Sequence, residues 1–434
     1  MIRRCALLLF FVLALGPLWG ELTIGGSSQA RLQAMIDPAA PAASVLSGLL
    51  GLSPSLRVGN PLFEFFFQGT LDCKTGTGSL NLSVDVFELT VEPADFLKIV
   101  VGRSQYRPGA APFLSPTNYF SPLGLEALLQ GRIQDAFLPS DIVQARMFWG
   151  DLAAVLTLAP FRREAALPDS SSPWFPRKGF PPSIHIGFPI EQDLVLEHIL
   201  IEAAKQMPAT PGLMSVCAEL GLTLPILDLA LLYYHGADCA PLFSARFDFP
   251  HGLFQGYDII LTPVDRTIDS FGLDATLGIS GLRIWVDCSY TLSKVFLTRR
   301  LSEANFSSVL GSSPCLEYSF GAGYDFEAPR LSLDAEWKGC WIVSPPEAVM
   351  TPLLSSLLYG RAFLRLWEDR FLAGAGAVWS LADRSLALLA DLTFAPSSEL
   401  SFQLLAPFFI GSADTELGQF SDNHLASLAA TWKF

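Results

Sequence analysis

The last ten residues of the chain, 425–434, alternate between two kinds of side chain with a period of two. One face of this segment carries only apolar side chains: Ala426, Leu428, Ala430, Trp432 and Phe434. The other face is mostly polar and ends at Lys433. Successive side chains of a β-strand point to opposite sides, so the pattern predicts a strand with one apolar face and one mostly polar face.

The same alternation recurs through the second half of the chain. Predicted strands cover residues 273–279, 282–291, 316–326, 331–341 and 386–394. Several of these runs reach ten residues or more and carry aromatic side chains near their ends. Strands of soluble sandwiches usually have about five or six residues. Long strands with aromatic ends are typical of proteins that cross a bilayer as tilted strands.

Charged residues show which face of these strands meets water. They occupy alternate positions on neighbouring predicted strands: Arg283, Asp287, Asp334, Glu336 and Lys338. A basic residue on the lipid face at mid-membrane depth costs about 2–4 kcal/mol. We therefore expect these five side chains to line a wet interior and the apolar face to point outward.

Composition supports a membrane protein without membrane-spanning helices. Hydrophobic residues make up 50% of the chain, charged residues 16%, and the mean hydropathy is +0.39. Beyond the N-terminal segment, the longest apolar run, 220–234, is interrupted by Pro225 and Asp228. Apolar residues dispersed at alternate positions are how a β-barrel crosses a bilayer. We predict an all-β, antiparallel transmembrane barrel whose closing strand ends at Phe434.

The N-terminal region divides into two predicted segments. A basic start, Arg3-Arg4, and a short apolar run, 6–15, predict a secretory signal peptide at residues 1–20, cleaved near Gly20. Residues 21–55 are rich in Ser, Ala and Pro, and we expect a lead-in or lumen segment with a short helix at 29–36. The barrel is then expected to span 56–434. At roughly 26 residues per strand and connection, the 414 residues beyond the predicted signal peptide correspond to about 16 strands, with about 12 to 18 allowed.

Two connections have unusual composition. Residues 102–123, GRSQYRPGAAPFLSPTNYFSPL, are rich in Gly, Pro and small polar residues, which predicts a long ordered loop. If this loop enters the lumen, Arg103 and Arg107 are candidates for a charged constriction. The alternative is that they bind the loop's own carbonyls or acidic neighbours. Residues 191–206 have helical spacing and predict a short helix, with a strand as the alternative.

Three segments and the terminal strand resemble known proteins. The loop GRSQYRPGAAPFLSPTNYFSP, the segment APFRREAALPDSSSPW at 159–174 and the run GLTLPILDLALLYYHG at 221–236 resemble a porin-like family of Gram-negative outer-membrane proteins. The terminal strand resembles the closing strand of bacterial outer-membrane barrels. The chain departs from the family at 107–109, where Arg-Pro-Gly replaces a common Trp-Gly.

The resemblance implies an outer-membrane location and a channel for small solutes. It also implies that Trp432 and Phe434 form a signal read by the barrel assembly machinery. The expected partners are outer-membrane lipid, this machinery and a small solute. A homotrimer is possible, but no interface is readable in the sequence.

Other functional classes receive little support. The net charge of −14 argues against nucleic-acid binding. The five histidines lie in no HExxH motif, and GxSxG, P-loop and GxGxxG motifs are missing, so we expect neither an enzyme nor a cofactor. With Cys5 in the predicted signal peptide, six cysteines remain: Cys73, Cys217, Cys239, Cys288, Cys315 and Cys340. No spacing among them selects a disulfide pairing, and without a CxxC pair we expect no metal site.

Three alternatives stay open. Apolar residues on expected lumen faces, Val100, Trp285 and Leu389, suit a conduit for hydrophobic molecules such as fatty acids. The long connection at 161–184 suits an adhesin that displays loops on a barrel. A soluble secreted β-protein would also show alternation.

Overall fold

The computed structural model describes most of the chain beyond residue 20. The described residues are 21–36, 45–60, 62–74, 80–133, 135–161, 168, 172–176, 183–186, 192–201, 214–238, 242–250, 256–264, 266–301, 308–347, 349 and 355–434. The predicted signal peptide at 1–20 and Cys239 lie outside them. No helix in this described part is both long and apolar enough to cross a lipid bilayer.

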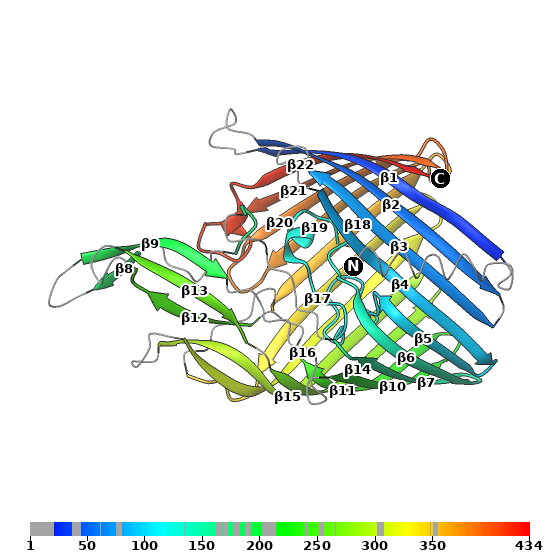
Figure 1. Ribbon diagram of the computed structural model, residues 1–434, viewed down its shortest axis with the longest axis horizontal. Helices are drawn as coiled ribbons and strands as arrows, with labels where there is room; N and C mark the ends of the chain where they lie inside the picture. Colours follow the sequence, from blue (N-terminus) through cyan, green and yellow to red (C-terminus); the bar gives the residue numbers. More distant parts are fainter. Residues whose placement is uncertain are drawn as a thin grey trace.

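Within the described residues, eighteen strands form one closed antiparallel barrel, shown in Figure 1. The strands are β1 Glu21–Ile36, β2 Val45–Asn60, β3 Phe63–Lys74, β4 Leu80–Ala94, β5 Leu97–Ser104, β6 Ser140–Trp149, β7 Leu152–Ala159, β10 Ser215–Thr223, β11 Leu227–Ala237, β14 Thr267–Ile279, β15 Leu282–Leu301, β16 Ser308–Phe326, β17 Leu331–Ile342, β18 Leu357–Leu366, β19 Phe371–Ser380, β20 Leu386–Phe394, β21 Leu400–Ile410 and β22 His424–Lys433. The predicted antiparallel barrel is confirmed, with eighteen strands instead of about sixteen.

The first and last strands close the ring. β1 pairs with β22 from Ser27 opposite Lys433 to Ile36 opposite His424. At the end of this seam, the backbone N–H groups of Gly26 and Phe434 each donate to the other residue's carbonyl oxygen, both at 3.0 Å. Every backbone group of a strand in lipid needs such a partner, so closure removes both sheet edges.

The structure corrects the expected lead-in. Residues 21–36 and 45–60 are barrel strands, so the predicted boundary at residue 56 and the predicted helix at 29–36 are wrong. β1 has neighbours on both sides, β2 and β22, and their hydrogen bonds outweigh the helical spacing of a short segment.

The faces of the strands follow the predicted alternation. On β15, the Ile284 side chain is 38% exposed on the outside of the barrel, whereas Asp287 is fully buried on the inside. At the other end of the chain, Trp432 and Phe434 are both about half exposed on the outer face. The apolar face of the sheet therefore points outward, where it meets lipid.

The two ends of the barrel differ in their connections. The end that carries Phe434 has short turns, such as Gly150-Asp151 between β6 and β7 and Ser280-Gly281 between β14 and β15. Long connections lie at the opposite end, where a four-stranded sheet projects from the barrel (Figure 1). Its strands are β8 Ser183–Ile186, β9 Gln192–Ile201, β12 Phe243–Asp248 and β13 Tyr257–Pro263. The helix predicted over 191–206 is therefore wrong, since β9 pairs with β8 and β13.

Candidate functional site

The connection between β5 and β6, residues 105–139, folds into the barrel and is called the lumen loop below. It contains the short helix α2, Leu125–Leu129 (Figure 1). Aromatic pairs seat it on the inner wall: Phe113 stacks on Tyr359 of β18 at 4.2 Å, and Tyr119 stacks on Tyr234 of β11 at 4.4 Å between ring centroids. The lumen loop thus contacts strands that are far apart around the ring.

Three wall carboxylates bind the lumen loop. The two oxygens of Asp287 accept the backbone N–H groups of Ala110 and Ala111 at 3.0 and 2.8 Å. Glu336 accepts those of Phe113 and Leu114 at 3.1 and 3.2 Å. Asp274 accepts the hydroxyl of Thr117 at 2.7 Å. Backbone N–H donors form strong hydrogen bonds with a carboxylate, so Asp287 and Glu336 are the main anchors for the loop, and Asp274 adds a third contact.

Two tyrosine hydroxyls extend the attachment. Tyr119 shares hydrogen bonds with Ser289 at 2.8 Å and Ser270 at 3.1 Å, and Tyr106 donates to Glu219 of β10 at 2.7 Å. Burial raises the pKa of Tyr119 to about 12. Its hydroxyl therefore keeps its proton at neutral pH and holds the middle of the loop to β14 and β15.

The two arginines predicted at the start of this loop stabilise its base. Arg103, at the end of β5, forms two hydrogen bonds with Asp141 of β6, at 2.7 and 2.9 Å. The guanidinium of Arg107 lies 3.5 Å from the ring centroid of Phe137, at the other end of the loop. Both contacts join the segment entering the loop to the segment leaving it, Arg103 through an acidic neighbour and Arg107 through an aromatic ring.

The other predicted lumen residues lie on β15 and β17. Asp334 is buried between Arg283, at 3.3 Å, and Arg361 of β18, at 2.6 Å. Lys338 lies on the lumen face, close enough to Glu317 of β16 for electrostatic interaction. Asp287 and Glu336 are buried beneath the lumen loop. Arg283 is the most exposed residue of the predicted set, with 51% of its side-chain surface accessible.

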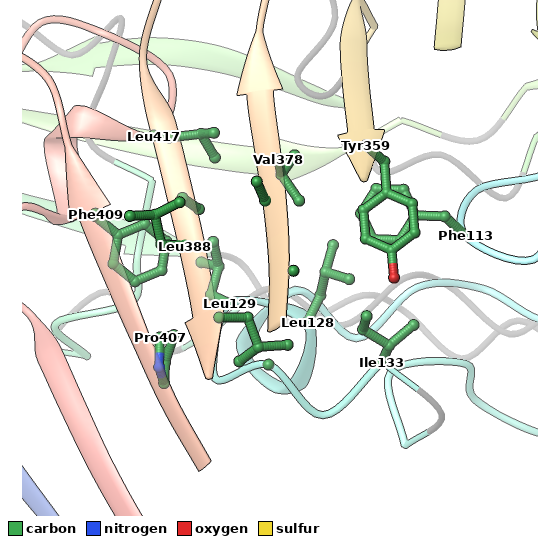
Figure 2. A pocket seen from close by; sticks show the side chains of 15 residues that line it. Phe113, Leu128, Leu129, Ile133, Tyr359, Val378, Leu388, Pro407, Phe409 and Leu417 are labelled. Atoms are coloured by element: carbon green, nitrogen blue, oxygen red, sulfur yellow. The ribbon is translucent and has the colours of Figure 1, made fainter. Parts of the chain in front are cut away.

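Apolar side chains of the lumen loop and of the barrel wall surround a small pocket, as Figure 2 shows. Leu128, Leu129 and Ile133 of the lumen loop face Val378 of β19 and Phe409 of β21 around a cavity of about 60 Å³. An engineered apolar cavity of about 150 Å³ stays dry and binds benzene. The smaller space here is an apolar packing gap beneath α2.

Two of the apolar residues expected on lumen faces, Leu389 and Trp285, pack against neighbouring side chains. Leu389 lines the cavity beneath α2. Trp285 is almost fully buried against β16, where a Cβ added at Gly321 would lie 2.5 Å from the indole ring. Only glycine leaves room for the ring at that position.

Charged side chains gather where the lumen loop faces the first strands of the barrel. Arg31 of β1 and Asp72 of β3 interact electrostatically with Arg132 of the loop, and Arg31 also interacts with Asp135. The Arg132 guanidinium lies 3.3 Å from the Asp135 carboxylate. Asp85 of β4 lies near Asp72. We name this group of five the charged rim.

The composition of residues 21–55 conceals the charged rim, because it predicts a lead-in where β1 lies. The signal was present, since Gln29, Arg31 and Gln33 alternate with Ala30, Leu32 and Ala34. Arg132 and Asp135 gave no signal, because their place depends on how the lumen loop folds.

A separate polar group lies in the four-stranded sheet. Ligand atoms of Glu197, His198 and Asp258 lie within 4.8 Å of one another. Asp258 already accepts the backbone N–H of His198 at 3.1 Å. The group lies on β9 and β13, outside the barrel.

Comparisons with known proteins find distant structural neighbours. No protein-family model and no curated protein matches the chain. Among solved structures, Salmonella typhi OmpF in complex with daunomycin is 9% identical with a TM-score of 0.44 and covers 95% of this chain and 97% of its own. OmpT, an outer membrane protein of Vibrio cholerae, is 12% identical with a TM-score of 0.39 and the same coverage. A structure titled "Asymmetric conductivity of engineered proteins" is 11% identical with a TM-score of 0.40, covering 95% of this chain and all of its own. Functional inference therefore rests on the side chains of this chain.

Proposed function

We propose that the protein is an outer-membrane channel for small polar solutes. The observation that supports this most is the lumen loop, which Asp287 and Glu336 bind inside a closed barrel. A barrel of this size has room for an aqueous passage. A loop held in the lumen narrows that passage.

In this proposal the passage lies beside the charged rim. Apolar packing occupies the lumen beneath α2, so water and solute pass between the lumen loop and the wall formed by β1 to β4. The rim carries Arg31 and Arg132 together with Asp72, Asp85 and Asp135. Rings of charged side chains set ion preference in channels, and charges of both signs suit polar or zwitterionic solutes.

Removing the two arginines of the rim is expected to make the channel more selective for cations. In planar bilayers with a salt gradient, the reversal potential of Arg31→Ala with Arg132→Ala should correspond to a cation-to-anion permeability ratio raised about twofold or more. Lys74 beside Asp72 and Arg103 beside Asp85 then remain as the positive charges near the rim, so its carboxylates outweigh them.

Arg330→Ala is the matched control, because Arg330 lies on the short turn after β16 and pairs with Asp369 at the barrel end. An equal shift in the control would assign the effect to overall charge and contradict a role for the rim. Wild-type protein that inserts without conductance steps would overturn the proposed channel itself.

A further inference from the structure

Two cysteines on neighbouring strands meet on the lumen face of the barrel. Cys315 of β16 is fully buried, Cys340 of β17 is partly exposed, and their sulfur atoms lie 3.2 Å apart. In the register of the two strands Cys315 is opposite Ile342 and Cys340 is opposite Glu317. The thiols therefore meet along a diagonal of one face, where cross-strand side chains are within reach of each other.

The other described cysteines have no such neighbour. Cys73 lies on β3 and Cys217 on β10, and the strands beside them carry no cysteine among the described residues. Cys288 of β15 is beside β16, but it follows Ile284 and Val286 on the outer face, whereas Cys315 points inward. Geometry thus selects one pair from the five cysteines that the structure describes.

We propose that Cys315 and Cys340 form a disulfide in the exported protein. A disulfide has a sulfur–sulfur bond of about 2.05 Å, so the two atoms need to approach by about 1.2 Å, which side-chain rotation supplies. Exported proteins fold where disulfides form and persist. The proposal depends on export through the predicted signal peptide, but it does not depend on channel activity.

The oxidation is a thiol–disulfide exchange with a disulfide-bonded protein oxidant of that compartment. The thiolate of Cys340, the more exposed of the two, attacks one sulfur of the oxidant's disulfide, and that bond breaks as a mixed disulfide forms. The thiolate of Cys315 then attacks Sγ of Cys340 and displaces the oxidant. The oxidant leaves as a dithiol with two electrons and the two thiol protons.

The position of this bond gives it a structural role. β17 ends at Ile342, two residues after Cys340, and the chain then leaves the wall while β15 and β16 continue beyond the barrel. The hydroxyl of Ser313 bonds the carbonyl oxygen of Ser344 at 3.1 Å at the same place. A covalent link between β16 and β17 holds this end of the wall beside the ion pair of Lys294 with Glu317.

Peptide mapping of the full-length exported protein tests the proposal. Protein extracted into detergent with excess maleimide and no reductant is denatured and cut with trypsin. We expect the peptides 301–330 and 339–361 to appear joined through Cys315 and Cys340, and to separate after reduction. Cys288, in peptide 284–294, should carry the maleimide and serves as the internal control.

Maleimide on both Cys315 and Cys340 in the unreduced sample overturns the proposal, as does a link from either cysteine to Cys239. With Cys315→Ser, Cys340 should become labelled. Reductant should lower the temperature of the heat-induced gel shift in wild type, but leave a Cys315→Ser, Cys340→Ser variant unchanged. A channel that does not conduct would leave all of these results intact, so the two proposals fail separately.

Discussion

Replacing Asp287 by Asn and Glu336 by Gln together is expected to raise the mean single-channel conductance about twofold or more. Each carboxylate accepts two backbone N–H groups of residues 110–114, and hydrogen bonds to charged groups contribute about 1.5–3 kcal/mol each. An amide offers one acceptor oxygen and places N–H donors against the remaining N–H group. The lumen loop then leaves the wall and widens the passage at the charged rim.

Asp228→Asn is the matched control for this variant. Asp228 also lies on an inner wall, on β11, but it is exposed near the short turn and opposite Thr276, away from the lumen loop. Its conductance should equal that of wild type. A double variant that inserts normally but conducts like wild type would show that the two carboxylates do not hold the loop in place, and would count against the proposed constriction.

Leu32→Arg is expected to destabilise the barrel, whereas Gln33→Arg is expected to be tolerated. The two residues are neighbours on β1, but Leu32 is 48% exposed on the outer face and lies opposite Leu428, near the middle of β22. An arginine facing lipid at mid-membrane depth costs about 2–4 kcal/mol, which lowers the folding equilibrium on the order of 30- to 700-fold. Gln33 faces the polar lumen, where a charged side chain stays hydrated.

Heat-modifiable migration on gels, with unfolding titrations in lipid vesicles, measures both variants. Equal stability of the two would contradict the assignment of β1 to the barrel wall. It would instead favour the lead-in that the composition of residues 21–55 predicted. The two variants carry the same substitution at adjacent positions of β1, so they differ only in whether the arginine faces lipid or the lumen.

The sequence alone could not reveal two elements that depend on distant partners. Residues 29–36 satisfy helical spacing and also alternate, and only the neighbours β2 and β22 decide in favour of a strand. Residues 192–201 form the strand β9 for the same reason, because they pair with β8 and β13. Short amphipathic segments are ambiguous when read locally, because β-propensity depends on the strands beside them.

The candidate site shows a similar division. The sequence predicted that Asp287 and Glu336 face the lumen and that residues 102–123 form an ordered loop. It could not show that these two features bind each other, since Ala111 and Asp287 are separated by 176 positions and Leu114 and Glu336 by 222. Their pairing exists only once β14 to β17 have taken their places in the ring.

The sequence by itself determined the strand faces, the outward apolar surface and the closing strand that ends at Phe434. Lipid outside and water inside select alternate side chains, so the two faces of a strand can be predicted from a short stretch of sequence. Only the tertiary structure decided the closure of β1 on β22, the seating of the lumen loop and the meeting of Cys315 with Cys340. These three features depend on which strands become neighbours, and strand neighbours are fixed only when the barrel closes.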